Sequence, residues 1–202
     1  ELKKRKKNKK LILLETGSGA SSLAMFLHCA LYGGRMFSWD TNASKGSFLK
    51  SVINESMCKI LKVDINKIWE FISYESTDKF VGLRVLKELK LKADFCFFDS
   101  LHTLDHLMSE IKSFEIVNNK EFVIALDDAY YTKKSKNFSY LNMIRQKLNL
   151  NKIKEPKSNQ CGPFYSEVKN YLKKRYRKVL HLNNYYQKNF KGDIFFSYFE
   201  SD

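Results

Sequence analysis

The segment Leu11–Ser21, LILLETGSGAS, is the strongest indication of how this 202-residue chain folds. Its apolar start predicts a buried strand, its two glycines predict a tight turn, and the residues that follow to about position 32 have the character of a helix. A glycine turn between a strand and a helix lets the backbone approach a ligand closely, and the start of the helix adds a positive dipole end. The pattern therefore predicts a site for a nucleotide-type cofactor.

The acid at Glu15 favours one class of cofactor over another. A dinucleotide would bring a pyrophosphate to this turn, and a carboxylate at the strand end would repel it. The methionine part of S-adenosylmethionine carries an ammonium group beside a sulfonium, which a carboxylate attracts. Ser22 also stands where the dinucleotide fingerprint has its third small glycine. We therefore expect S-adenosylmethionine, with NAD(P) as the alternative.

A second strand over residues 36–40 ends in Asp40, a little over twenty residues after Gly17. In nucleotide-binding folds a carboxylate at this position accepts hydrogen bonds from both ribose hydroxyls. Asp40 could instead serve as a helix cap or turn residue. The spacing favours a ribose contact.

Strand-like and helical segments alternate along the whole chain. The expected strands are 11–15, 36–40, 69–74, 94–99, 121–127, 177–182 and 193–199, and the expected helices are 19–32, 44–62, 79–90, 103–117, 138–148 and 163–175. This alternation predicts an α/β fold, a Rossmann-like doubly wound sheet that is mostly parallel. The last two strands are too close for a helical crossover, so we expect an antiparallel C-terminal pair. The expected organisation is a basic N-terminal stub over 1–10 and one domain over 11–202.

Composition limits the classes of protein to which the chain can belong. A hydrophobic content of 44% excludes a disordered chain, and no apolar run approaches the length of a membrane span. The four cysteines are widely scattered, which predicts reduced thiols and a cytoplasmic protein. Because the sequence begins with Glu1 rather than Met, we expect a further N-terminal portion.

The net charge of +14 is unevenly distributed. Residues 133–192 hold 16 Lys and Arg against two acids, whereas residues 11–132 are mildly acidic. A basic face attracts nucleic acid, anionic glycans or acidic lipid surfaces. The alternative is a solvated surface without a partner.

Acidic side chains and a histidine follow the two strands in the middle of the chain. Asp99 and His102 follow the fourth strand, and Asp127 and Asp128 end the fifth. Ligands of open α/β sheets bind at the carboxyl ends of the strands, where these carboxylates would repel one another unless a cation neutralised them. Oxygen ligands suit Mg²⁺, Ca²⁺ or Mn²⁺ rather than zinc. His102 is either a general base or a helix-capping residue.

These motifs together resemble the class I S-adenosylmethionine-dependent methyltransferases. The resemblance rests on Glu-x-Gly-x-Gly-x-Ser at 15–21, the strand-end Asp40, Phe-Phe-Asp-x-x-His at 97–102 and Leu-Asp-Asp at 126–128. It covers roughly residues 11–132 and is most similar to the branch with family 24 and the metal-dependent sugar and small-molecule O-methyltransferases. Such a relationship implies a Rossmann-like enzyme that methylates an oxygen.

The resemblance also implies roles for individual residues. Residues that would contact the cofactor are Glu15, Gly17, Gly19 and Ser21 at the methionine part and the turn, Asp40 at the ribose, Glu75 and Ser76 beside the adenine, and Asp99. Asp99, Asp127 and Asp128 would hold a divalent metal, most simply Mg²⁺, and Asp99 and His102 would be catalytic. His28, His106 and His181 are expected to have no chemical role.

The sequence departs from the family pattern in two places. Ser100 and Leu101 replace a glycine and an acid after Asp99, and Ala129-Tyr130 follow the acidic pair where relatives often carry a further ligand. Metal dependence is therefore an open question here. The function expected is methyl transfer to a hydroxyl of a sugar or another small molecule, for which the basic residues would suit an anionic acceptor. The alternatives are a nucleic-acid methyltransferase and a non-catalytic module that binds S-adenosylmethionine.

Overall fold

The computed structural model describes residues 10–101, 103–127, 136–151, 165–175, 178–181 and 196–200. Its strands are β1 (Leu11–Thr16), β2 (Gly34–Trp39), β3 (Trp69–Ile72), β4 (Ala93–Phe98), β5 (Asn118–Asp127), β6 (Lys178–His181) and β7 (Phe196–Glu200). Its helices are α2 (Ala20–Tyr32), α3 (Ala43–Ile53), the π-helical stretch η1 (Asn54–Cys58), α4 (Lys59–Leu61), α5 (Ile65–Ile68), α6 (Val85–Glu88), α7 (Leu104–Val117), α8 (Lys136–Lys147) and α9 (Tyr165–Lys173).

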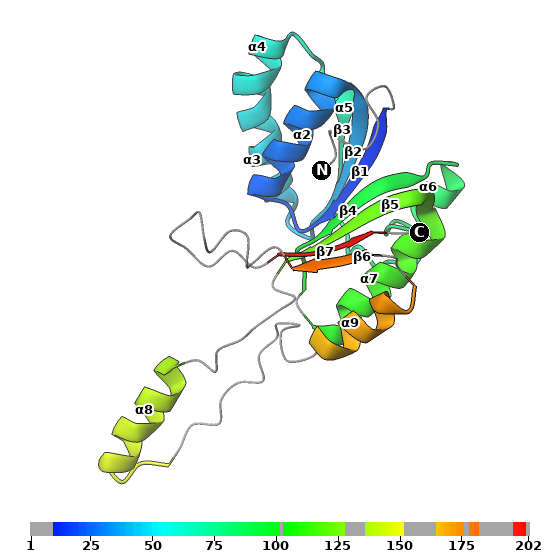
Figure 1. Cartoon of the computed structure of the whole chain (residues 1–202). Helices are drawn as coiled ribbons and strands as arrows, with labels where there is room; N and C mark the ends of the chain where they lie inside the picture. The colour runs from blue at the N-terminus through cyan, green and yellow to red at the C-terminus, as the bar shows by residue number, and fades with distance from the viewer. Residues whose placement is uncertain are drawn as a thin grey trace.

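The strands form one sheet in the order β3-β2-β1-β4-β5-β7-β6. The first five strands in this order are parallel, with Leu14 of β1 opposite Phe37 of β2 on one side and Cys96 of β4 on the other. β7 runs antiparallel to both β5 and β6 (Figure 1). From β1 the chain first builds outward to β3 and then returns to β4, so the strand order reverses between β1 and β4. This topology confirms the expected doubly wound α/β class.

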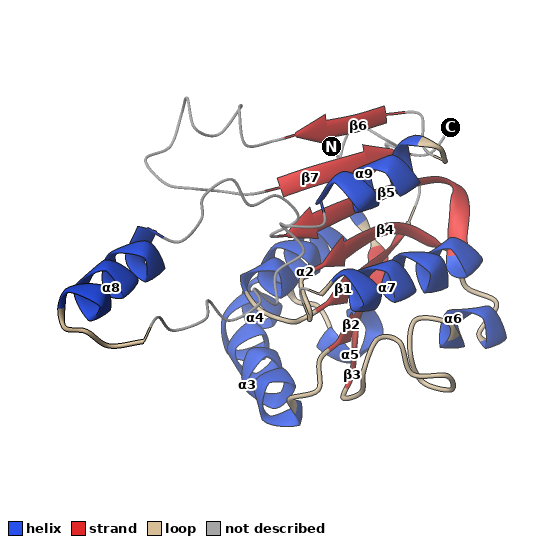
Figure 2. Cartoon of the chain, turned by 90° about the horizontal axis from the view of Figure 1, so that it is seen from below, coloured by secondary structure: helices blue, strands red, loops and turns tan. Residues whose placement is uncertain are grey.

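Helices cover both faces of the sheet, with α2 and α3 on one face and α6, α7 and α9 on the other (Figures 1 and 2). Alternating strand residues face opposite ways, as the pleat requires. Leu13 belongs to the buried cluster that contains Phe26 of α2, whereas Leu14 belongs to the cluster that contains Ile111 of α7. Two cores therefore hold β1 in the centre of the sheet and fix the position of the turn that follows it.

The prediction of a helix over residues 79–90 is wrong for most of that range, because the α-helix found there, α6, covers only Val85–Glu88. The carboxylate of Asp78 accepts hydrogen bonds from the backbone N–H groups of Phe80 (2.8 Å) and Val81 (2.9 Å). A Cβ at Gly82 would lie 2.4 Å from the carbonyl oxygen of Ser76, so the chain folds back on itself closely at this point. A side-chain-capped turn has replaced the helix because Asp78 offers the backbone an alternative set of partners.

Two further findings concern possible membrane spans and the cysteines. Within the described part of the chain, no helix combines the length and the apolar character needed to cross a membrane. Cys29, Cys58 and Cys96 are buried free thiols, and Cys161 lies outside the described residues.

Candidate functional site

The turn after β1 depends on Gly17. Its φ of +80° suits glycine, and a Cβ there would lie 1.7 Å from the carbonyl oxygen of Asp99. The absence of a side chain therefore brings the turn against the loop that follows β4. Gly19 differs, because its φ of 174° is extended and a Cβ there would meet no atom within 4 Å. The fold requires Gly17, while Gly19 leaves open space at the start of α2.

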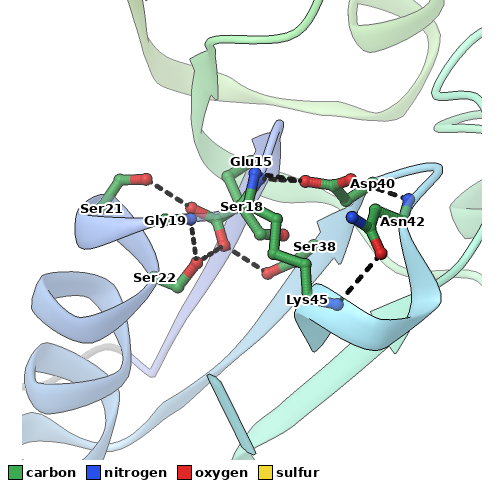
Figure 3. A network of polar contacts seen from close by, with 9 residues as sticks. All are labelled: Glu15, Ser18, Gly19, Ser21, Ser22, Ser38, Asp40, Asn42 and Lys45. Atoms are coloured by element: carbon green, nitrogen blue, oxygen red, sulfur yellow. Dashed lines mark hydrogen bonds and ion pairs between the residues drawn. The ribbon is translucent and has the colours of Figure 1, made fainter. Parts of the chain in front are cut away.

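The backbone N–H groups of residues 17–19 all have partners within the chain. Gly17 donates to the Trp39 carbonyl (2.8 Å), and Ser18 donates to Oδ2 of Asp40 (2.9 Å). Gly19 donates to Oγ of Ser22 (3.0 Å), as Figure 3 shows. The expectation that the turn would present these N–H groups to a ligand is therefore wrong for residues 17–19. A pyrophosphate would have to break these contacts, which disfavours a dinucleotide.

Glu15 lies at the centre of a buried polar group that we call the Glu15 cluster, consisting of Glu15, Ser21, Ser22 and Ser38. Its Oε1 accepts hydrogen bonds from the hydroxyls of Ser22 and Ser38, and its Oε2 accepts one from Ser21 at 2.9 Å (Figure 3). The Ser38 hydroxyl in turn accepts a hydrogen bond from Nε1 of Trp69 (2.7 Å). Burial raises the pKa of Glu15, and the serine hydrogen bonds only partly oppose this shift.

Asp40 connects the turn after β1 to the start of α3. Its Oδ2 accepts hydrogen bonds from the Ser18 N–H and from Nζ of Lys45 (2.8 Å), and its Oδ1 accepts one from the Asn42 N–H (2.9 Å). Burial alone would raise the pKa of Asp40, but these hydrogen bonds, Lys45 first, lower it further than burial raises it. Asp40 is therefore an ionised carboxylate at the carboxyl end of β2, as a ribose contact requires.

A cavity of about 420 Å³ lies at the carboxyl ends of β1 to β4. It is lined by Gly17, Trp39, Asp40, Thr41, Lys45, Tyr74, Glu75, Ser76, Asp99, Ser100, Leu101 and His106. Five of the residues expected to contact the cofactor are thus brought together here: Gly17, Asp40, Glu75, Ser76 and Asp99. Among the described residues, Glu15, Gly19 and Ser21 are not part of this lining, and Glu15 is completely buried.

Two buried hydroxyls near the turn have no hydrogen-bond partner within the described part of the chain. They are Oγ1 of Thr16 and Oγ of Ser18, which flank Gly17. Buried polar groups without partners are rare in native proteins and often mark a place that a bound molecule completes. Both residues are buried, and of these three consecutive residues Gly17 is the one that lines the cavity described above.

A second buried carboxylate, Glu110 of α7, contacts three residues that line the cavity. Its Oε1 accepts hydrogen bonds from the hydroxyls of Ser76 and Ser100 (2.7 Å) and lies 3.3 Å from Nε2 of His106. We call Glu110, Ser76, Ser100 and His106 the Glu110 cluster. The hydrogen bond to Glu110 raises the pKa of His106, although burial acts in the opposite direction, and the charge of Glu75 adds to the increase.

His106, which we expected to have no chemical role, lines the cavity and was not among the residues predicted to lie there. Neither His106 nor Glu110 belongs to a motif. The available signal was their spacing of four residues, which places both on one side of α7, close to the buried Leu107 and Ile111. A charged residue among the apolar positions of a helix needs a partner, and this requirement could have indicated the pair.

The predicted metal site is only partly within the described residues. Phe98, the last residue of β4, pairs with Leu126 of β5. Asp99, the next residue after β4, and Asp127, the last residue of β5, therefore occupy neighbouring positions. His102 and Asp128 lie outside the described residues. Within the described ranges, no three His, Cys, Asp or Glu side chains are grouped so that they could hold a metal ion.

No protein-family model matches this chain, and no curated protein matches it. Solved structures do resemble it. A protein of Nostoc punctiforme assigned as an O-methyltransferase shares 10% identity at a TM-score of 0.58, with 96% of this chain and 53% of that chain covered. MycE is a methyltransferase of mycinamycin biosynthesis that was solved with Mg, S-adenosylhomocysteine and mycinamycin VI. It shares 12% identity at a TM-score of 0.51, and the match covers 96% of this chain and 46% of MycE. An rRNA methylase of Streptococcus thermophilus shares 10% identity at a TM-score of 0.50, and the match covers 96% of this chain and 88% of the methylase.

The similarity to these solved structures concerns the fold. The chain spans about half the length of the Nostoc protein and of MycE. Identities of 10–12% show a common architecture and do not by themselves transfer an activity. The sheet order, the glycine turn after β1 and these likenesses together show a Rossmann-like α/β fold, which the chain shares with these methyltransferase structures.

Proposed function

We propose that the chain binds S-adenosylmethionine in the cavity at the carboxyl ends of β1 to β4 and transfers its methyl group to a hydroxyl of a sugar or another small molecule. The observation that carries this proposal is the cavity itself, which combines the Gly17 turn with Asp40 and Asp99. It lies where the strand order reverses, the position at which open α/β sheets bind ligands. The metal-dependent branch that includes family 24 is the subgroup we favour.

The residues present fit this cofactor better than a dinucleotide. The N–H groups of residues 17–19 are already used, so the turn lacks free donors for a pyrophosphate at these positions. Asp40 is ionised and lines the cavity, and the buried hydroxyls of Thr16 and Ser18, which have no hydrogen-bond partner within the described part of the chain, flank the Gly17 turn beside it. When bound, S-adenosylmethionine supplies a methyl group already activated by a sulfonium. The protein then mainly orients the acceptor, which can contribute up to roughly 7–11 kcal/mol.

Proton removal from the acceptor is the second requirement of the proposal. His102 would accept the hydroxyl proton as general base. Asp99, Asp127 and Asp128 would hold a divalent cation, Mg²⁺ before Mn²⁺ or Ca²⁺, whose charge would lower the pKa of the acceptor. The neighbouring positions of Asp99 and Asp127 on β4 and β5 support this arrangement.

Calorimetric titration with S-adenosylhomocysteine tests the cofactor. We expect binding, and we expect Asp40→Ala to weaken it by about 1.5–3 kcal/mol, the range for hydrogen bonds to a charged group. Asp64→Asn is the matched control, because Asp64 is an exposed acid that caps α5 and Asn caps equally well. Binding of NADH without binding of S-adenosylhomocysteine would refute the proposal.

Methyl transfer after EDTA treatment tests the cation. We expect activity to fall and to return with Mg²⁺ or Mn²⁺, and we expect Asp128→Asn to remain low after replacement of the metal. Asp64→Asn should respond to EDTA and Mg²⁺ as the unmodified chain does. Full activity without metal would reject the cation and leave His102 as the main group for proton removal.

The charge distribution favours a second candidate, a nucleic-acid methyltransferase. Residues 133–192 carry 16 Lys and Arg against two acids, and an rRNA methylase shares the fold. If RNA is the acceptor, its affinity must fall steeply as salt rises. Absent or salt-independent RNA binding would favour the small-molecule acceptor. Cofactor binding without transfer to any acceptor would indicate the third reading, a non-catalytic binding module.

A further inference from the structure

A second cavity, of about 490 Å³, lies at the opposite end of the sheet from the cavity around Gly17. Its lining comes from the amino ends of β1 and β2, the carboxyl end of α2, and α5. β1 has six residues, so roughly 20 Å of strand separates the two cavities at about 3.3 Å for each residue. A ligand bound in the second cavity would therefore leave the first one free.

All the charged side chains in this lining are cationic. They are Lys10, which precedes β1, Arg35 of β2 and Lys67 of α5. Leu11 lies opposite Gly34 in the parallel pairing of β1 and β2, so Lys10 and Arg35 lie one residue to either side of this pair. Strand register and the packing of α5 thus bring the three charges together from separate segments.

The acids near this edge of the sheet do not line the cavity. Glu70 forms an ion pair with Arg35 (3.2 Å), and Asp94 accepts hydrogen bonds from Asn119 and from the backbone N–H of β1. Within the described part of the chain, no ion pair is found for Lys10 or Lys67. The carboxyl end of α2 adds only about half a negative charge. Two cations therefore remain without a paired acid.

The deeper part of the lining is neutral. Cys29 is 2% exposed, and burial raises the pKa of its thiol to about 12, so the thiol is not ionised near neutral pH. Ile12 and Ile68 add apolar surface. Electrostatic attraction is stronger beside an apolar wall than in open water, so an anion held against these residues would feel the cations strongly.

A glycine pair brings the walls of this cavity close together. Gly34 has a φ of +130°, and a Cβ there would lie 2.4 Å from the carbonyl oxygen of Leu11. Gly33 has a φ of +76°, and a Cβ there would lie 3.4 Å from Cγ of Lys10. The aliphatic part of Lys10 therefore lies against the end of α2, which places its ammonium group at the edge of the cavity.

A phosphate group matches this arrangement. It carries three strong acceptor oxygens that point in different directions, whereas a carboxylate has two oxygens in one plane. Arginine and lysine are the side chains that bind phosphate most readily, and the cavity has the volume of a small-molecule site. We propose that this second cavity binds a phosphate-bearing ligand through Lys10, Arg35 and Lys67. The phosphate belongs either to a small phosphorylated molecule or to an RNA chain, and this inference does not depend on the cofactor.

NMR titration of the full chain tests the site. The amide signals of Gly33 and Gly34 report on it, and the amide signal of Gly17 reports on the other cavity. The probes are inorganic phosphate and ribose 5-phosphate at constant ionic strength. We expect saturable shifts at Gly33 and Gly34, while the Gly17 signal stays unchanged.

Lysine variants test which charges hold the ligand. Lys10→Gln and Lys67→Gln should keep the fold, because both side chains are exposed, and each should weaken ribose 5-phosphate binding on the order of 3- to 10-fold, since exposed charges are partly screened. Lys87→Gln is the matched control. Lys87 lies in the last turn of α6, a four-residue helix like α5, and it does not line the cavity. Its substitution should leave the affinity unchanged.

An RNA oligonucleotide with and without a 5′-phosphate distinguishes the two sources. If RNA shifts Gly33 and Gly34 at lower concentration than ribose 5-phosphate, and its affinity falls steeply with salt, the phosphate belongs to RNA. If ribose 5-phosphate saturates the site and RNA does not shift these signals, the ligand is a small molecule. Absence of saturable shifts at Gly33 and Gly34, or equal weakening by Lys87→Gln, would overturn the site. Cofactor binding is measured separately at Gly17, so either proposal can fail without the other.

Discussion

Two buried carboxylates, Glu15 and Glu110, each gather serine hydroxyls, yet they perform different tasks. Glu15 is completely buried, and all three of its side-chain partners are hydroxyls. Glu110 is almost as deeply buried, but one of its partners is the imidazole of His106, and its three partners line the cavity. The first group supports the turn from behind, and the residues bonded to Glu110 in the second group line the cavity.

The difference shows how a buried carboxylate is accommodated. Hydroxyl donors stabilise the charge of Glu15 only in part, so burial dominates and raises its pKa. An imidazole can carry a proton and a positive charge, so His106 and Glu110 can form an ion pair whose strength depends on pH. A group of neutral donors therefore makes a fixed support, whereas the addition of a histidine makes a group that can respond to a ligand or to pH.

Removal of the carboxylate from the Glu15 cluster should have the largest effect on stability. Glu15→Ala leaves the buried hydroxyls of Ser22 and Ser38 without their acceptor, which we expect to cost about 2–6 kcal/mol at roughly 1–3 kcal/mol for each orphaned group. Urea unfolding followed by circular dichroism measures the loss. Glu15→Gln keeps one acceptor oxygen and should lose clearly less. Equal losses in the two variants would show that packing, and not hydrogen bonding, explains the cluster.

Serine substitutions in the two clusters should cause smaller losses of stability, and the loss should be larger in the Glu15 cluster than in the Glu110 cluster. Ser38→Ala removes a donor from Glu15 and the acceptor of the buried Trp69 indole, so we expect a loss of about 1–3 kcal/mol. Ser100→Ala should cost about 1 kcal/mol or less, because Ser100 is half-buried and Glu110 keeps Ser76 and His106. The same unfolding assay compares them. A larger loss for Ser100→Ala would reverse the assignment of support and ligand site.

The smallest effect should be a pH dependence in two separate windows. Folding raises the pKa of Glu15 above 4.5. The stabilisation that follows from this shift is therefore complete below pH 4.5 and is lost as pH rises through the pKa of Glu15 in the folded state. Folding raises the pKa of His106 above 6.5, so its contribution is lost in the same direction but at higher pH. Stability measured from pH 4 to 9 should therefore lose its upper step in His106→Gln and its lower step in Glu15→Gln. An upper step that persists in His106→Gln would assign it to another group.

The sequence predicted what local pattern and spacing encode. Apolar runs located all five parallel strands to within a few residues, and the spacing from Gly17 to Asp40 identified two residues that line the cavity. Glu110 was missed because its role arises only when α7 packs beside the loops that follow β3 and β4, a relation that no local motif records. The region before α6 was misjudged because Asp78 and Gly82 close a turn in place of a helix. Tertiary contacts explain both differences.

The chain contains two tryptophans, and each belongs to one side of this comparison. Trp69 donates to Ser38 of the Glu15 cluster, and Trp39 lines the cavity and donates to the Val81 carbonyl (2.7 Å). Both indoles are 1% exposed, so both should emit at short wavelength in the folded protein. In a Trp39→Phe variant the remaining fluorescence would come from Trp69, beside the Glu15 cluster. In a Trp69→Phe variant it would come from Trp39, which lines the cavity. The molecule thus carries two intrinsic optical reporters, one for the integrity of the sheet and one for occupancy of the site.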